Sequence, residues 1–315
     1  MLNRKIITAS AIVLFLFLFV GCKNSVTDNE GNPQILSDKT AIEQIAREDS
    51  SLLSFETNYD EEGGLDFSFG KIQTKIFPVR VVRKITNVDR VYLTDIVGDT
   101  SYVTATYSFT GNLFIAASYD SVSLGDSINV DTIIVKPFTS VITRKLIFVR
   151  VANTQNPRLN WRLIAISLPA GGTATPNIAI QKLTMLFPND TLVITSPNDY
   201  FLSRGLGRMN QIPGIGRNQR LTIYAEIFSS YNAEDFVTLT FGADIRGLHR
   251  VKRKFILDSI TPSGNGYLKV YKLTFSTLTF TGHSHAVISA IPNHVVFDDQ
   301  TSVESKTWGF PYFVY

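Results

Sequence analysis

The chain has 315 residues, of which 44% are hydrophobic and 18% are charged, and it contains 22 Phe and 12 Tyr. This composition excludes an intrinsically disordered chain and supplies enough apolar and aromatic surface for one or two folded domains. The net charge of +3 is too small to indicate a nucleic-acid-binding protein.

The charges are unevenly distributed along the chain. Residues 23–70 contain eleven acidic and three basic side chains, whereas residues 71–315 contain sixteen acidic and 25 basic ones. An acidic leading segment therefore precedes a basic body. Solvation of a tether and one helix explains the acidic segment, and the alternative is an envelope protein whose basic body faces anions.

The start of the chain has the three parts of a secretory signal peptide. The basic residues Arg4 and Lys5 precede an apolar run that ends at Val20, and the small residue Gly21 and the only cysteine, Cys22, follow. A transmembrane helix needs about 20 apolar residues, so this run is short for a permanent span. The alternative is a free cysteine inside a transmembrane helix.

The ending Val20-Gly21-Cys22 resembles the lipobox of bacterial lipoproteins. The resemblance implies that residues 1–21 are a signal peptide, that the Cys22 sulfur receives a diacylglycerol, and that the new amino group is often acylated. Two or three acyl chains, at about 0.8 kcal/mol per buried CH₂, give an anchor that one chain does not. The mature body then has no thiol, which excludes disulfides, thiolate zinc sites and cysteine nucleophiles.

Residues 22–38 are predicted to be the lipidated cysteine and a flexible polar tether. In enterobacterial lipoproteins, an Asp directly after the cysteine retains the protein at the inner membrane. Lys23 occupies that position here. The resemblance therefore favours the outer membrane where the cell has one.

Residues 39–170 are predicted to form an α+β domain. Apolar residues recur at helical spacing over about 39–56, and Ser37 or Asp38 can cap that helix. The period then changes to two, and Gly98-Asp99-Thr100 predicts a hairpin turn. Strands are predicted at 91–97, 101–109, 112–118, 142–151 and 160–168.

A helix followed by long antiparallel strands that end in RKLIFVRV and NWRLIAISL resembles the NTF2-like cone fold. That family often carries an Arg-rich strand and then a Trp-Arg pair such as Trp161-Arg162, and its curved sheet can enclose a ligand. We interpret Trp161 as a packed aromatic residue and Arg144, Arg150 and Arg162 as exposed strand residues. The alternatives are a ligand platform and a substrate clamp.

The segment from Pro169 to Pro176 is rich in Gly, Pro and small polar residues, which predicts a linker at 171–177 and a second domain at 178–315. The stretch from Gly282 to Ile291, an acidic loop and an aromatic last strand resemble strands F and G of an immunoglobulin-like β-sandwich. Strands are predicted at 178–187, 191–196, 220–229, 236–243, 251–260, 267–280, 285–291 and 307–314.

The sequence GHSHA, residues 282–286, resembles the nucleophile elbow of α/β-hydrolases. That motif needs a helix after the serine, whereas the following AVISAIP is typical of a strand, so we expect no elbow at Ser284. His283 and His285 lie on one face of a strand, and Asp298 follows in the next loop, which makes a weak candidate metal site. Two ordinary histidines are the interpretation that we favour over zinc, which needs three or four ligands.

Two basic stretches are candidate binding surfaces. The first comprises Arg246, Arg250, Lys252 and Lys254, of which the last three would point one way from a strand, with Val251 on the other face. Such a row can meet anionic lipid headgroups or acidic polysaccharide, or it can keep an edge strand soluble.

The second stretch is a glycine-containing loop over residues 203–217. Arg204, Arg208, Arg217 and Arg220 make it a candidate anion or glycan loop. The alternative is an ordinary loop between strands.

Lipobox, tether, NTF2-like half and immunoglobulin-like half together resemble bacterial envelope lipoproteins. We expect a non-catalytic binding or scaffold module that contacts the membrane through its anchor, with envelope proteins or glycans as partners, no nucleic acid and no cofactor. The alternatives are a small-ligand carrier that uses the NTF2-like cone and an envelope hydrolase or metal enzyme that uses His283, Ser284 and His285.

Overall fold

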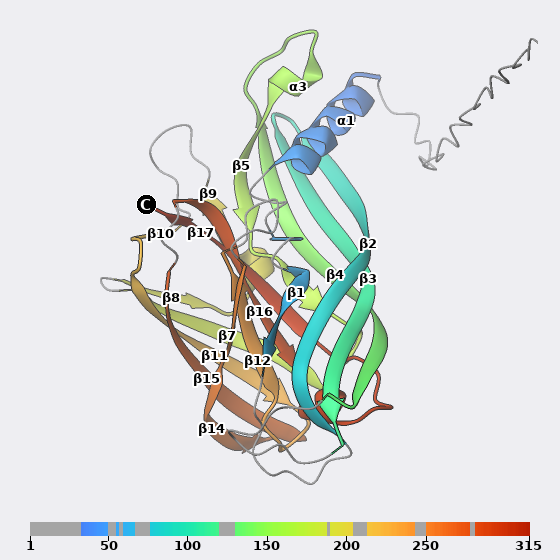
Figure 1. Ribbon diagram of the computed structural model, residues 1–315. Helices are drawn as coiled ribbons and strands as arrows, with labels where there is room; N and C mark the ends of the chain where they lie inside the picture. Colours follow the sequence, from blue (N-terminus) through green and yellow to red (C-terminus); the bar gives the residue numbers. More distant parts are fainter. Residues whose placement is uncertain are drawn as a thin grey trace, which may run out of the picture.

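The computed structural model describes residues 33–49, 55–56, 59–66, 76–119, 130–187, 190–203, 213–242, 250–277 and 281–315. The fold is mostly β, with few helices and two sheets, the larger of which is strongly curled (Figure 1). Among the described residues, the helices with defined bounds are α1 (Pro33–Glu48), α3 (Pro157–Asn160), α4 (Asn293–Phe297) and the 3₁₀ turn η1 (Pro197–Asp199).

The larger sheet joins three long strands near the start of the chain to the last strands of the chain. Its order is β1 (Glu61–Asp66), β2 (Phe77–Val97), β3 (Thr100–Ser118), β4 (Thr132–Arg150), β6 (Ala170–Gly172), β17 (Lys306–Val314), β16 (Gly282–Ile291), β12 (Phe236–Phe241) and β13 (Val251–Lys254). Beside this path, β5 (Trp161–Ser167) pairs with β4 and β9 (Phe201–Ser203), and β10 (Gly214–Ile215) pairs with β17.

The smaller sheet faces the C-terminal strands of the larger one. Its order is β14 (Ile256–Ser263), β15 (Gly266–Ser276), β11 (Arg220–Ser229), β7 (Ile178–Phe187) and β8 (Asp190–Ile194). The two inner faces share one apolar core, to which both β11 and β17 contribute. The second half of the chain is therefore two packed β-layers, as the strand pattern predicted.

The long strands form because polar and apolar residues alternate over their whole length. In β3, every second side chain from Ser101 to Ala117 is buried, and the residues between them are more exposed. The predicted turn is confirmed, because Gly98 adopts a φ of +59° between β2 and β3. The predicted strands at 101–109 and 112–118 are parts of this one strand.

The large sheet curls until its two ends approach each other. β1 lies beside β13, and the Lys252 Nζ donates to the Val81 carbonyl oxygen at 3.5 Å. The concave side is filled by α1 and by aromatic side chains, among them Phe55, Tyr59 and Phe109. A second apolar cluster lies beneath α4 at the other end of the long strands.

The start of α1 differs from the prediction. The helix begins at Pro33 rather than near residue 39, and proline favours a first helical position because its missing N–H is not needed there. Asp38 therefore lies inside the helix and is not a cap. It is 1% exposed and accepts a hydrogen bond from the Arg150 Nη2 at 2.7 Å.

Two further expectations are wrong. Arg144 is fully buried rather than exposed, because its face of β4 is the concave face of the curled sheet. The predicted strand at 251–260 is two strands in different sheets, since the chain passes from β13 to β14 at the buried Phe255. Trp161 is confirmed as a packed residue, 4% exposed beneath the Arg150 guanidinium.

The segment expected to be a linker contains a strand that joins the two halves of the chain. Gly171 pairs with Ile142 of β4 on one side and with Thr307 of β17 on the other. A Cβ atom at Gly171 would lie 1.9 Å from the Val141 carbonyl oxygen, so the backbones approach too closely for any other residue. The predicted domain boundary thus lies within a continuous sheet.

We predict that Gly171→Val lowers the free energy of unfolding by more than about 3 kcal/mol, because the side chain would force β4 and β6 apart. Ala174→Val, in the same expected linker but exposed, is the control. Urea denaturation of both purified variants measures the difference. Equal stability of the two variants would mean that the segment is a linker.

Candidate functional site

The GHSHA stretch does not form a nucleophile elbow. Residues 282–291 are one continuous strand, β16, between β17 and β12. His285 is fully buried, and its ring lies edge-on to Phe55 with 6.1 Å between centroids. The side chains of His283 and Ser284 lie outside the described residues. A substrate therefore has no access to His285.

Asp298 does not meet the histidine pair. It follows α4, beyond the end of β16 at Ile291, and β16 alone separates His285 from that end by about 20 Å. Among the described residues, no group of three or more His, Cys, Asp or Glu side chains is arranged to hold a metal ion.

The candidate basic surface is divided by the curl of the sheet. Lys252 is 5% exposed and points toward β2, so it is not part of an exposed row. Lys254 pairs with Glu234 at 3.0 Å, Arg250 is partly exposed, and Arg253 is the exposed cation of β13. Arg246 lies outside the described residues. The alternative interpretation, in which these residues belong to an edge strand, fits the structure because β13 is the last strand in the order of the sheet.

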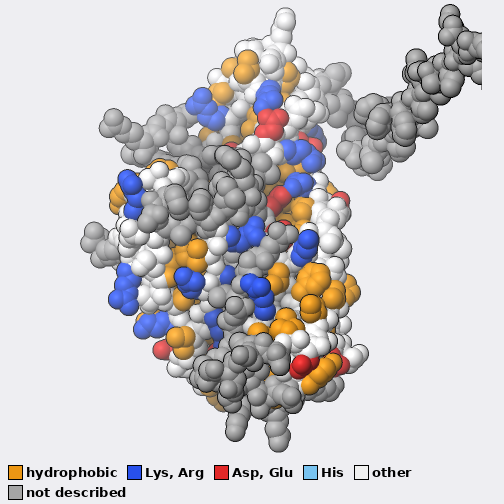
Figure 2. Space-filling view, viewed as in Figure 1, with side chains coloured by type: hydrophobic (Ala, Val, Ile, Leu, Met, Phe, Trp, Pro, Cys, Tyr) orange, Lys and Arg blue, Asp and Glu red, His pale blue; other side chains and the backbone are white. Residues whose placement is uncertain are grey.

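The candidate anion loop is described only in part. Arg217 and Arg220 are exposed at the turn between β10 and β11, whereas Arg204 and Arg208 lie outside the described residues. Figure 2 shows lysine and arginine side chains spread over the middle of one face of the molecule.

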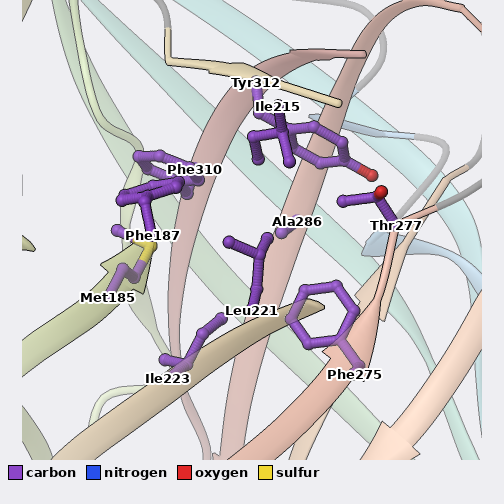
Figure 3. A pocket seen from close by; sticks show the side chains of 10 residues that line it. All are labelled: Met185, Phe187, Ile215, Leu221, Ile223, Phe275, Thr277, Ala286, Phe310 and Tyr312. Atoms are coloured by element: carbon purple, nitrogen blue, oxygen red, sulfur yellow. The ribbon is translucent and has the colours of Figure 1, made fainter. Parts of the chain in front are cut away.

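A small apolar cavity lies between the two sheets (Figure 3). Its volume is about 20 Å³, which is room for about one water molecule. The side chains that line it point toward one another from both layers: Met185, Phe187, Ile215, Leu221, Ile223, Phe275, Thr277, Ala286, Phe310 and Tyr312. This cavity is a packing gap of the core rather than a ligand site.

A larger and more polar pocket lies beside α4. It has a volume of about 220 Å³, and we call it the α4 pocket. Two acidic side chains, a lysine, an asparagine and two phenylalanines line it, which offers donors, acceptors and apolar contact together. The lining residues are Ala233, Glu234, Asp235, Phe236, Lys254, Asn293 and Phe297.

A buried ion pair holds the wall of the α4 pocket. Asp235 and Lys269 are both fully buried, with 2.8 Å between the Asp235 Oδ2 and the Lys269 Nζ. The Ser229 hydroxyl donates to the other carboxylate oxygen at 3.0 Å, and the Asp235 N–H donates to the Tyr271 hydroxyl at 2.7 Å. Burial raises the pKa of the Asp235 carboxyl, and Lys269 acts against that rise. These contacts fix the loop between β11 and β12.

A histidine and a carboxylate lie next to this pocket. The His294 Nε2 is 4.0 Å from the Glu304 Oε2, and the Tyr231 ring lies 3.9 Å from the His294 ring, centroid to centroid. Glu304 also accepts a hydrogen bond from the Asn177 side-chain amide at 2.8 Å. Burial lowers the pKa of His294, and Glu304 counteracts that effect. The separation exceeds hydrogen-bond distance, so this is not an assembled acid–base pair.

The sequence does not indicate the α4 pocket. Asp235 and Lys269 are 34 residues apart, and each is an ordinary charged residue in its own segment. In the sequence, His294 draws attention only because it follows the histidine pair a few residues later. A signal exists in hindsight at Lys269, since a lysine on the inner face of the alternating strand β15 needs a buried acidic partner.

Comparisons with protein-family models, curated proteins and solved structures found no match. In the described part of the chain, no helix has the length and apolar content needed to cross a bilayer.

We predict that Lys269→Met lowers the free energy of unfolding by about 3–5 kcal/mol, because it leaves the Asp235 carboxylate buried without its cation. Lys272→Ala, on the same strand but exposed, should cost less than about 1 kcal/mol. Urea denaturation measures both values. A Lys269 variant as stable as the Lys272 variant contradicts the role of the pair.

We predict that acid weakens the fold in part through His294. The unfolded residue binds a proton as pH falls through 6.5, whereas the folded residue, with its lowered pKa, binds it only at lower pH. This contribution to stability is therefore present above that range and is lost below it. His294→Phe, which keeps the ring beside Tyr231, should lose less stability than the wild type between about pH 7.5 and about pH 5.5. Identical losses in urea titrations would exclude the effect.

Proposed function

We propose that this chain is a lipid-anchored module of the bacterial cell envelope that binds or scaffolds other envelope components without catalysis. The observation that carries the proposal is the order of basic start, apolar run and Val20-Gly21-Cys22. The acyl chains on Cys22 would hold the body at a membrane surface, and Lys23 favours the outer membrane.

The arrangement of the described side chains counts against the two alternative functions. A carrier needs a roomy apolar pocket, whereas the cavity between the sheets holds about 20 Å³, and Phe55 and Tyr59 occupy the concave side of the long strands. A hydrolase or metal enzyme at GHSHA needs an accessible histidine, whereas His285 is fully buried.

The two finer fold assignments belong to the same proposal. Helix α1 against the concave side of a curved antiparallel sheet supports an NTF2-like first half. Two packed β-layers, with β16 and β17 adjacent, support an immunoglobulin-like second half. The strand β6 within the large sheet counts against two independent domains.

We place binding of the envelope partner at the α4 pocket. Glu234, Lys254 and Asn293 can hydrogen-bond to a polar partner such as a glycan or an extended peptide. The buried pair of Asp235 and Lys269 keeps this wall rigid, which lowers the entropic cost of binding.

The test is the covalent state of the mature amino terminus. We expect mass spectrometry of the protein from bacterial membranes to find a chain that begins at Cys22 and carries diacylglycerol, and a Cys22→Ser variant to lack that mass and to leave the membrane fraction under a high-salt wash. An unmodified Cys22 in a membrane-free wild-type protein would refute the anchor.

A further inference from the structure

The outer face of the β2–β3 hairpin carries exposed apolar side chains near its turn. Val91, Leu93 and Val97 of β2 are 63%, 73% and 61% exposed, and Tyr102 of β3 is 51% exposed. Tyr102 lies opposite Asp95, between Leu93 and Val97 along the neighbouring strand, so the four side chains are contiguous. We call them the hairpin patch.

The hairpin patch lies at the end of the molecule where the described chain begins. Asp38 of α1 pairs with Arg150, which also pairs with Asp99 in the hairpin turn at 3.4 Å. α1, α3 and this turn gather at the same end in Figure 1. Helix α1 itself starts five residues before Asp38, at Pro33. Arg150 thus ties the first described helix to the turn of the hairpin that carries the patch.

The chain between the proposed lipid and this end is short. Cys22 precedes Pro33 by eleven residues, which span at most about 40 Å when fully extended. A body tethered so closely meets the bilayer at a high effective concentration. Its α1 end therefore meets the bilayer more readily than the α4 end, from which it is separated by the length of β3, about 60 Å along the strand.

The composition of the patch suits the bilayer interface. Valine and leucine side chains gain by leaving water, and tyrosine is enriched at the level of the headgroups. Asp95 lies within the same face. Its carboxylate limits the patch to a shallow position in the bilayer, because a charge is costly in the hydrocarbon region. Leu159 of α3, at the same end of the molecule, is another exposed apolar residue (63%). Figure 2 shows hydrophobic, basic and acidic side chains next to each other at this end.

We infer that the hairpin patch is a second membrane contact, which lies in the headgroup region of the bilayer to which Cys22 is anchored. The inference rests on the proposed lipid anchor. It assigns the orientation of the body: the α1 end faces the bilayer, and the α4 pocket faces away from it.

The experiment uses the mature lipoprotein, purified from membranes and reconstituted in vesicles of phosphatidylethanolamine and phosphatidylglycerol. One chain carries Leu93→Cys and the other Ile133→Cys, each labelled with an environment-sensitive dye. Ile133 is 63% exposed on the outer face of β4. Across β3, the residue of β4 that lies in line with Leu93 is Lys145. Ile133 lies twelve residues from Lys145 along β4, which places it about 40 Å from the level of Leu93. The two sites thus match in exposure and differ in position.

We expect bromine-labelled lipids to quench the dye at Leu93→Cys and to leave the dye at Ile133→Cys unchanged. Leu93→Asp should reduce the quenching of a dye at Val97→Cys, whereas Ile133→Asp should not, which separates the patch from insertion by the dye itself. Absent quenching at Leu93→Cys, or equal quenching at both sites, would overturn the assignment. A shift of the dye emission with protein concentration without lipid would assign the patch to a second copy of the chain instead.

Labelling also separates failure of this inference from failure of the anchor. Cys22 is the only native cysteine, so an acylated chain takes one dye and an unmodified chain takes two. One dye without quenching at Leu93→Cys refutes the second contact and leaves the anchor intact. Two dyes refute the anchor, whatever the quenching.

Discussion

The fold depends on the close approach of three backbones at β6. Gly171 and Gly172 lie between β4 and β17, and a side chain at either position would collide with a carbonyl oxygen, that of Val141 or that of Ser305. The hydrogen bond from the Gly309 N–H to the Pro169 carbonyl, at 2.8 Å, continues the same contact. Because β6 pairs on both sides, the long strands near the start of the chain and the last strands at its end belong to one sheet, and the core continues beneath it.

The continuous sheet determines how the proposed anchor and the α4 pocket are placed relative to each other. Because the sheet runs unbroken through β6, no hinge separates the two halves of the described chain. The α1 end and the α4 pocket therefore keep a fixed separation. The three long strands act as the spacer, since β2, β3 and β4 each have about 20 residues. In an anchored lipoprotein, such a body would hold its polar pocket away from the bilayer while its hairpin patch stays at the surface. The ion pair between Asp38 and Arg150 fixes α1, the helix that follows the tether, to this body at the point where force from the anchor would enter.

Much of the strand content follows from the sequence, because period-two alternation and the glycine at position 98 are local signals. What alternation leaves open is which face of a strand is buried and which strand it pairs with. Lys252 is the clearest case, since the curl of the sheet turns its face toward β2, and a row of lysines gives no sign of that. The glycines at 171 and 172 have the composition of a linker, yet here they serve close packing. The α4 pocket combines residues from the loop between β11 and β12, from β12, from β13 and from α4, and its Asp235 pairs with Lys269 of β15. Only the folded chain brings these residues together, so no sequence motif indicates the pocket.

The central claim is that the described chain folds as one unit joined at β6, and amide hydrogen exchange of the purified protein tests it most directly. The account predicts that peptides covering residues 139–146, 169–173 and 305–309 are protected together and exchange with one common opening free energy, close to that of global unfolding. Rapid exchange of residues 169–173, with separate opening of the segments on either side, would contradict it.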